Sequence, residues 1–136
     1  MKKVLIIDDD VTFQLTMANK LKEGGYATVA ALDGEAGLEQ VKAEKPDLIL
    51  LDVNMPKLDG IGFLKKLQEA YAGEKQIPVY ITSNLSAIDK ISEGVSLGIK
   101  GYILKSDESL DTILSGVDST LNPRPTEYEL PEAPAA

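Results

Sequence analysis

The 136-residue chain contains no cysteine and no histidine. The lack of cysteine excludes disulfide frameworks, thiolate metal sites and CxxC redox chemistry. The lack of histidine excludes Ser-His-Asp and Cys-His catalysis and most transition-metal sites, and it means that the chain itself cannot carry a phosphohistidine. Any metal that this protein binds must therefore accept oxygen ligands.

Long hydrophobic runs are also missing. The apolar run Val4–Ile7 follows Met1-Lys2-Lys3, but it is too short for the hydrophobic region of a signal peptide and ends in three aspartates. No other stretch is long enough to cross a bilayer. The formal net charge of −8 repels nucleic-acid backbones and anionic membrane surfaces. We therefore expect a cytoplasmic protein that binds neither nucleic acid nor membrane directly.

Short apolar runs alternate with helical patterns along the chain. The runs predict strands at Val4–Ile7, Ala27–Leu32, Leu48–Leu51, Pro78–Thr82 and Gly101–Lys105. Helices are predicted from about Asp10 to Gly24, from Asp33 through Val41, from Ile61 to Tyr71, from Ile88 to Gly98, and from Leu110 to Leu121. The apolar stripe of the first helix is predicted to consist of Val11, Phe13, Leu15, Met17, Ala18 and Leu21. Five β-α units in succession predict an α/β fold, a doubly wound parallel sheet with helices on both faces.

Residues 1–121 are predicted to form one domain, because the composition changes after Leu121. Residues 122–136 are rich in proline and show no periodicity. Proline removes backbone hydrogen-bond donors, so this segment is predicted to be an extended or disordered tail or linker, too short for an output domain. A stand-alone protein and a domain cut from a longer chain are both compatible with this pattern.

Polar residues follow the predicted strands at the points where four of them end. Asp8 and Asp9 follow the first strand and Asp52 follows the third, while Thr82 and Lys105 end the fourth and fifth. In a doubly wound sheet, ligands bind at the carboxyl ends of the strands, and in the order 2-1-3-4-5 the first and third strands are neighbours. We therefore expect Asp8, Asp9 and Asp52 to share one crevice.

Three carboxylates that lie close together need a compensating cation. Mg²⁺ suits such a site because it prefers oxygen ligands and completes its octahedron with water and phosphate oxygens. A carboxylate can also act as a nucleophile, and a lysine and a hydroxyl can stabilise a transferred phosphoryl group. Mg²⁺-dependent phosphoryl chemistry is therefore the predicted activity.

These residues resemble a known family, the bacterial response-regulator receiver domain, over roughly residues 1–121. The matching motifs are Asp8-Asp9, the run Asp52-Val53-Asn54-Met55-Pro56-Lys57-Leu58-Asp59-Gly60, Thr82, and Gly101-Tyr102-Ile103-Leu104-Lys105. The resemblance implies a flavodoxin-like sheet of strand order 2-1-3-4-5. It also implies a two-component signalling switch rather than an enzyme that turns over a substrate.

The resemblance implies a role for each acidic residue at these strand ends. Asp52 would accept a phosphoryl group from the phosphohistidine of a sensor histidine kinase or of a phosphotransfer protein. Asp8, Asp9 and Asp52 would hold Mg²⁺ directly or through water, and the backbone carbonyl of Asn54 would be a further ligand.

The same resemblance implies how the domain would switch. Thr82 would bond the phosphoryl oxygen and Lys105 would pair with it electrostatically. Tyr102 matches the switch aromatic, whose rotamer is coupled to inward movement of the Thr82 hydroxyl. The surface remodelled in the family corresponds here to about residues 86–121, through which a downstream protein target would bind, and a homodimer formed on phosphorylation is a further option.

Two positions depart from the family pattern. Ser106 follows Lys105 where the family commonly has a cis proline. A cis bond before a non-proline residue costs about 2.5–4 kcal/mol, so the cis or trans state of this peptide is left open. Ser83 replaces the more usual alanine or glycine and is expected to narrow access to the site.

Competing interpretations come from other classes of protein. Taken singly, Asp8, Asp9 and Asp10 are also typical of helix entry, where acids cap the helix and complement its dipole. A haloacid-dehalogenase-like phosphatase would need DxD at the nucleophile, whereas Asp52 is followed by Val53-Asn54. A flavodoxin-type flavin module would need a Ser/Thr/Gly-rich phosphate loop after the first strand. A phosphorylation-independent interaction domain with the same fold is a third alternative.

Overall fold

The computed structural model describes residues 1–53, 60–70, 77–83, 94–104 and 110–122. Its strands are β1 (Lys3–Ile7), β2 (Ala27–Ala31), β3 (Leu48–Asp52), β4 (Val79–Ser83) and β5 (Gly101–Leu104). Its helices within these ranges are α1 (Val11–Glu23), α2 (Gly34–Glu44), α3 (Gly60–Ala70) and α5 (Leu110–Leu121). The helix predicted from Ile88 to Gly98 lies largely outside the described residues, among which residues 94–96 are helical.

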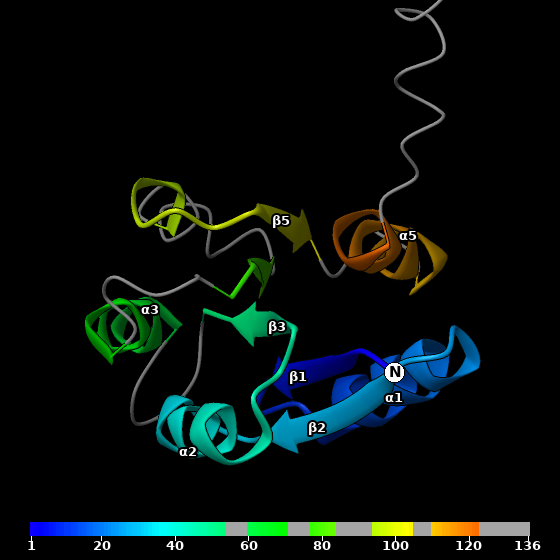
Figure 1. The fold of residues 1–136 in the computed structure, drawn as a ribbon, viewed down its shortest axis with the longest axis horizontal. Helices are drawn as coiled ribbons and strands as arrows, with labels where there is room; N and C mark the ends of the chain where they lie inside the picture. The colour runs from blue at the N-terminus through cyan, green and yellow to red at the C-terminus, as the bar shows by residue number, and fades with distance from the viewer. Residues whose placement is uncertain (54–59, 71–76, 84–93, 105–109, 123–136) are drawn as a thin grey trace, which may run out of the picture.

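The five strands form one sheet in the order β2-β1-β3-β4-β5, and every neighbouring pair is parallel. The predicted α/β fold and strand order are therefore confirmed. β2 and β5 are the outermost strands of the sheet, and the helices lie on either side of it (Figure 1). Because β1 and β3 are adjacent although α1, β2 and α2 separate them in the chain, the end of β1 meets the end of β3.

Alternate strand residues enter two separate cores, one on each face of the sheet. Helices α2 and α3 cover one face, and α1 and α5 cover the other (Figure 1). The α2/α3 core contains Leu5, Ile7, Ile49, Leu51, Val53, Phe63, Leu64 and Ile81, among others. The α1/α5 core contains Val4, Ile6, Met17, Leu21, Leu48, Leu50, Ile113 and Val117, among others. Burial on both faces explains why these strands are aliphatic throughout rather than alternating with polar residues.

Four of the six residues predicted for the apolar stripe of α1 contact the core, namely Phe13, Met17, Ala18 and Leu21, and two do not. Val11 and Leu15, both assigned to its apolar stripe, are 52% and 63% exposed. The buried residues of α1 are Gln14, Met17 and Leu21. They follow one another at spacings of three and four, as expected of a single helix face. The predicted stripe was therefore wrong at Val11 and Leu15, and it left out Gln14, a polar residue that is buried.

Side-chain caps begin the first two helices. Asp10 Oδ1 accepts a hydrogen bond from Phe13 N at 3.1 Å, and Asp33 Oδ1 accepts one from Ala36 N at 2.9 Å. Both contacts satisfy a backbone donor that the first helical turn leaves without an intrahelical acceptor. After α1 the chain turns at Gly25, whose φ of 94° is easily reached only by glycine. Among the residues with described placement, no helix is long and apolar enough to span a membrane.

Candidate functional site at the carboxyl edge of the sheet

Two buried aspartates lie side by side where β1 and β3 end. Ile7 of β1 pairs with Leu51 of β3, so the next residues of the two strands, Asp8 and Asp52, are neighbours. Asp8 is fully buried and Asp52 is 5% exposed. Carboxylates are rarely buried to this degree without a charge partner or a metal. This position at the switch point of the sheet is where doubly wound folds bind their ligands.

Asp9 adds a third carboxylate to this pair. One oxygen from each of Asp8, Asp9 and Asp52 lies within 4.8 Å of the other two, and Asp9 is exposed to solvent. Three negative charges at this separation repel one another, and a divalent cation relieves that repulsion. Because the donors are all carboxylate oxygens and one side is open to water, the set fits Mg²⁺, which keeps several water ligands.

The backbone around Asp8 holds its carboxylate in place. Asp8 N donates to Ala31 O at 3.0 Å, which joins the end of β1 to the end of β2. Asp8 Oδ1 accepts from Asp10 N at 2.9 Å, and Asp10 in turn caps α1. The three consecutive aspartates therefore have different roles: Asp10 caps the N-terminus of α1, while Asp8 and Asp9 belong to the carboxylate cluster.

A buried hydroxyl residue lies next to Asp52. Thr82 of β4 pairs with Asp52 of β3 and is 1% exposed. Residues paired in neighbouring strands present their side chains to the same face of the sheet. Thr82 thus lies one strand further along the same edge, as the sequence predicted.

Gly60 allows the chain to pass closely behind the cluster. A Cβ atom at this position would lie 2.6 Å from Val53 Cα and 2.8 Å from Asp52 O, and neither is an atom that a side-chain rotation could move away. Gly60 N also donates to Val53 O at 3.3 Å. The glycine that ends the Asp52–Gly60 motif therefore lets α3 start directly against the end of β3.

The remaining predicted site residues are placed only in part. Tyr102 pairs with Ile81, lies on β5 and is 55% exposed. Lys105 and Ser106, and Asn54 with its backbone carbonyl, lie outside the described residues. The structure thus brings together Asp8, Asp9, Asp52 and Thr82.

Sequence reasoning missed one buried polar residue beside this site. Gln14 of α1 is 7% exposed, and its Nε2 donates to Ala31 O at 2.6 Å and to Ile6 O at 3.4 Å. The signal was present in the sequence, because Gln14 stands at helical spacing from Met17 and Leu21 where an apolar residue would be expected.

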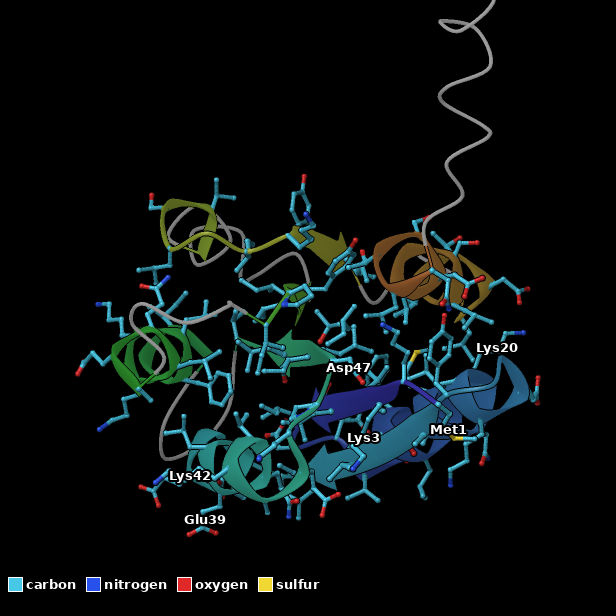
Figure 2. All side chains as sticks on the ribbon, viewed as in Figure 1. Met1, Lys3, Lys20, Glu39, Lys42 and Asp47 are labelled. Carbon is cyan, nitrogen blue, oxygen red and sulfur yellow. The ribbon has the colours of Figure 1, made fainter. Side chains whose placement is uncertain are left out.

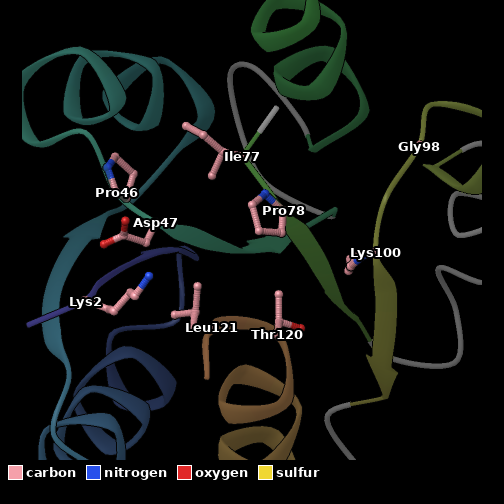
Figure 3. Close-up of a pocket in the computed structure, with 9 residues that line it drawn as sticks. All are labelled: Lys2, Pro46, Asp47, Ile77, Pro78, Gly98, Lys100, Thr120 and Leu121. Carbon is pink, nitrogen blue, oxygen red and sulfur yellow. The ribbon is translucent and has the colours of Figure 1, made fainter. Parts of the chain in front are cut away.

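A pocket of about 550 Å³ lies at the opposite edge, where the strands begin (Figure 3). The residues that line it include Pro46 and Asp47 before β3, Pro78 before β4, Leu121 at the end of α5, and two lysines, Lys2 and Lys100. The carboxylate cluster contributes no residue to it. We place the candidate site at the cluster rather than in this pocket, because three carboxylates converge in the cluster, whereas Asp47 is the one carboxylate among the described residues that line the pocket and it lies beside lysines.

Comparison with known proteins identifies the family to which this fold belongs. The family model of the response regulator receiver domain matches residues 4–115. The alkaline phosphatase synthesis transcriptional regulatory protein PhoP of Bacillus subtilis is 37% identical over 105 residues, which are 76% of this chain and 42% of that protein. A probable transcriptional regulator, ycf27, of Cyanophora paradoxa is 36% identical over 104 residues, again 76% of this chain and 42% of the relative. The chain thus spans less than half the length of these curated relatives.

Solved structures show the same architecture. The chemotaxis protein CheY4 of Vibrio cholerae superposes with a TM-score of 0.79 at 28% identity, covering 89% of this chain and 99% of that one. The receiver domain of the Francisella response regulator 1452 superposes with a TM-score of 0.76 at 33% identity, covering 87% of this chain and 94% of that one.

Proposed function

This chain belongs to the response regulator receiver domain family, and we propose on that basis that it is a phosphorylation switch whose phosphoacceptor is Asp52. Receiver domains are phosphoacceptors in two-component signalling rather than enzymes that turn over a substrate. The observation that carries the proposal is the cluster of Asp8, Asp9 and Asp52 carboxylates, whose oxygens lie within 4.8 Å of one another at the switch point of the sheet.

The proposed reaction is a single transfer to a carboxylate. An oxygen of Asp52 attacks the phosphorus of a phosphohistidine on a sensor histidine kinase or a phosphotransfer protein. A new P–O bond forms, the P–N bond breaks, and the histidine nitrogen keeps the electron pair. Asp52 suits this role because it ends β3 and its backbone is held in the sheet, so the nucleophile is positioned in advance.

Mg²⁺ is the proposed cofactor, and when bound it supplies positive charge against the oxygens of the transferred group. Asp8 and Asp9 would hold the ion, directly or through water, together with Asp52 and the backbone carbonyl of Asn54. Burial of Asp8 and Asp52 lowers the local dielectric and strengthens their attraction for a divalent cation. The exposure of Asp9 leaves one side of the site open to water and to the phosphodonor.

Thr82, Lys105 and Tyr102 are the proposed switch residues. The Thr82 hydroxyl would bond a phosphoryl oxygen on Asp52, its partner across the strand pair, and Lys105 would pair with the phosphoryl charge. Tyr102 is 55% exposed in this structure, so an inward rotation of its ring on activation would bury aromatic surface.

The proposed output is a protein contact made by β5, α5 and the predicted helix before β5. The formal net charge of −8 disfavours direct contact with nucleic acid. The curated relatives are named as transcriptional regulators but are more than twice as long as the matched region, so transcriptional control is not assigned to these residues. A homodimer formed only on phosphorylation is an alternative output, which sedimentation of labelled protein would detect. The cytoplasmic location stays a prediction.

The test is the intact mass of the protein after incubation with a small acyl phosphate, with and without Mg²⁺. We expect a single labile phosphoryl adduct that requires Mg²⁺ and is absent from the Asp52→Asn variant. Asp47→Asn is the matched control, because Asp47 lies at the other edge of the sheet and its Oδ2 accepts a hydrogen bond from Lys3 N. This control should label like the wild type.

Two results would contradict the proposal. Full labelling of Asp52→Asn would place the nucleophile elsewhere. A wild-type protein that binds Mg²⁺ but never gains a phosphoryl group would favour a phosphorylation-independent interaction domain.

A further inference from the structure

Gln14 is the one polar side chain among the buried residues of α1. At 7% exposed, its amide has left water and needs hydrogen-bond partners inside the protein. Both partners are backbone carbonyls, Ala31 O at 2.6 Å and Ile6 O at 3.4 Å. Only the amide nitrogen can donate to both, so the orientation of the side chain is determined by these contacts.

The stronger of these contacts is shared with a proposed metal ligand. Ala31 O also accepts from Asp8 N at 3.0 Å. Asp8 Oδ1 accepts from Asp10 N at 2.9 Å, and Asp10 O accepts from Gln14 N at 3.0 Å. These four hydrogen bonds close a ring that leads from the Gln14 amide to the Asp8 carboxylate and back through the first turn of α1.

We infer that Gln14 is a positioning residue for the carboxylate cluster: it fixes the start of α1 against the ends of β1 and β2 and thereby aims the Asp8 carboxylate at the metal position. The inference rests on the proposed function, because it takes Asp8 to be a metal ligand. An apolar side chain would serve equally well if this position only packed the helix. An amide is needed if the position also has to hold the backbone that carries Asp8.

The experiment compares Mg²⁺ affinity and stability in three versions of the full chain. Gln14→Met removes both donors while keeping a long side chain. Leu21→Ala, at the other end of the same buried face, disturbs the packing of α1 without touching the ring of hydrogen bonds. Each protein is titrated with Mg²⁺ by calorimetry, without any phosphodonor, and its urea midpoint is measured separately.

We expect Gln14→Met to lose roughly tenfold or more in Mg²⁺ affinity, the size of effect seen when partners that orient a metal ligand are removed. Leu21→Ala should keep the wild-type affinity although its urea midpoint falls at least as far. If Gln14→Met does not fold, Gln14→Asn takes its place, because it keeps an amide on an arm too short to reach both carbonyls.

The outcomes separate the two proposals. Unchanged Mg²⁺ affinity in the Gln14 variants, beside a wild type that binds Mg²⁺ and is labelled on Asp52, overturns the inference and leaves the proposed function standing. Equal losses of affinity in Gln14→Met and Leu21→Ala also overturn it, because Gln14 would then act through stability alone. A wild type that binds no Mg²⁺ overturns both.

Discussion

The two edges of the sheet use acidic residues in different ways. At the edge where the strands begin, Asp47 Oδ2 accepts a hydrogen bond from Lys3 N at 2.8 Å, and Figure 2 labels both residues. Glu44 forms an ion pair with Lys3 Nζ at 2.9 Å. The side chains of this ion pair are 31% and 40% exposed. At the edge where the strands end, Asp8 and Asp52 are buried, and a third carboxylate is close by. At the starting edge, dispersed acids beside a lysine stabilise the fold. At the carboxyl edge, crowded buried acids attract a divalent cation.

A second polar group at the starting edge is also structural. The Tyr26 hydroxyl, just before β2, donates to Asp118 Oδ1 of α5 and accepts from Asn122 Nδ2 at 2.9 Å. Tyr26 is 3% exposed. These contacts attach the end of α5 to the sheet. Among the residues that the structure describes, the one group of clustered carboxylates lies at the other edge. The phosphorylation chemistry is therefore expected to depend on one edge only.

The largest expected effect is at the carboxyl edge. Asp8→Asn removes one of three charges that attract the cation, so Mg²⁺ affinity should fall by more than the roughly 10- to 100-fold that is lost when a residue orienting a metal ligand is removed. The wild type should gain about 2.7 kcal/mol of stability at a Mg²⁺ concentration a hundred times its dissociation constant, and the variant should gain much less at that concentration. Urea unfolding with and without Mg²⁺ measures the stabilisation of each protein by the ion. Equal stabilisation of the two proteins would remove Asp8 from the metal site.

A smaller effect is expected at high pH from Tyr26. Burial, followed by the hydrogen bond to Asp118, raises the pKa of Tyr26 from 10.0 to about 12. Between these values the unfolded chain loses the phenolic proton while the folded protein keeps it. The stabilisation from Tyr26 is therefore complete below pH 10 and declines as the pH rises toward 12.

Tyr26→Phe provides the comparison for this prediction. The free energy of unfolding of the wild type should fall more steeply with pH than that of the variant between pH 10 and 12. The difference in slope should correspond to about one proton released on unfolding. Mg²⁺ affinity at neutral pH should be the same in both proteins. Identical alkaline slopes in urea unfolding would show that the Tyr26 hydroxyl does not carry this effect.

The smallest expected effect is at the ion pair of the starting edge. Glu44→Gln removes a partly exposed charge, and such pairs contribute about 0.2–1 kcal/mol to stability. Urea unfolding should show a loss within this range, and calorimetry should show unchanged Mg²⁺ binding. A loss of Mg²⁺ affinity in this variant as large as that of Asp8→Asn would contradict the division between the two edges.

Much of the fold and the site could be read from local patterns. The aliphatic runs Val4–Ile7 and Leu48–Leu51 predicted strands buried on both faces, and both strands lie between the two cores. Polar residues that directly follow such runs had to lie at the carboxyl edge, because parallel strands end on one side of their sheet. The prediction that Asp8, Asp9 and Asp52 come together was confirmed for this reason.

One inward position of α1 could not be predicted in the same way. Val11 and Leu15 are apolar and helical in spacing, yet both are exposed, while Gln14 faces the sheet. A prediction from hydrophobic periodicity considers only how unfavourable it is to expose each side chain to water. It takes no account of backbone carbonyls on other strands. Ala31 O and Ile6 O are the acceptors that make a buried amide favourable here, and they lie within hydrogen-bond distance of Gln14 only when the chain is folded.

The sequence by itself determined the order of elements, the buried strands and the presence of acids and a hydroxyl residue at their ends, because these depend on neighbours along the chain. The tertiary structure alone decided which role each of the consecutive aspartates has. Asp10 caps α1, whereas Asp8 is buried beside Asp52, 44 positions later in the chain. The physical reason is that charge density and desolvation depend on distance in space, and β1 meets β3 only when the sheet is assembled.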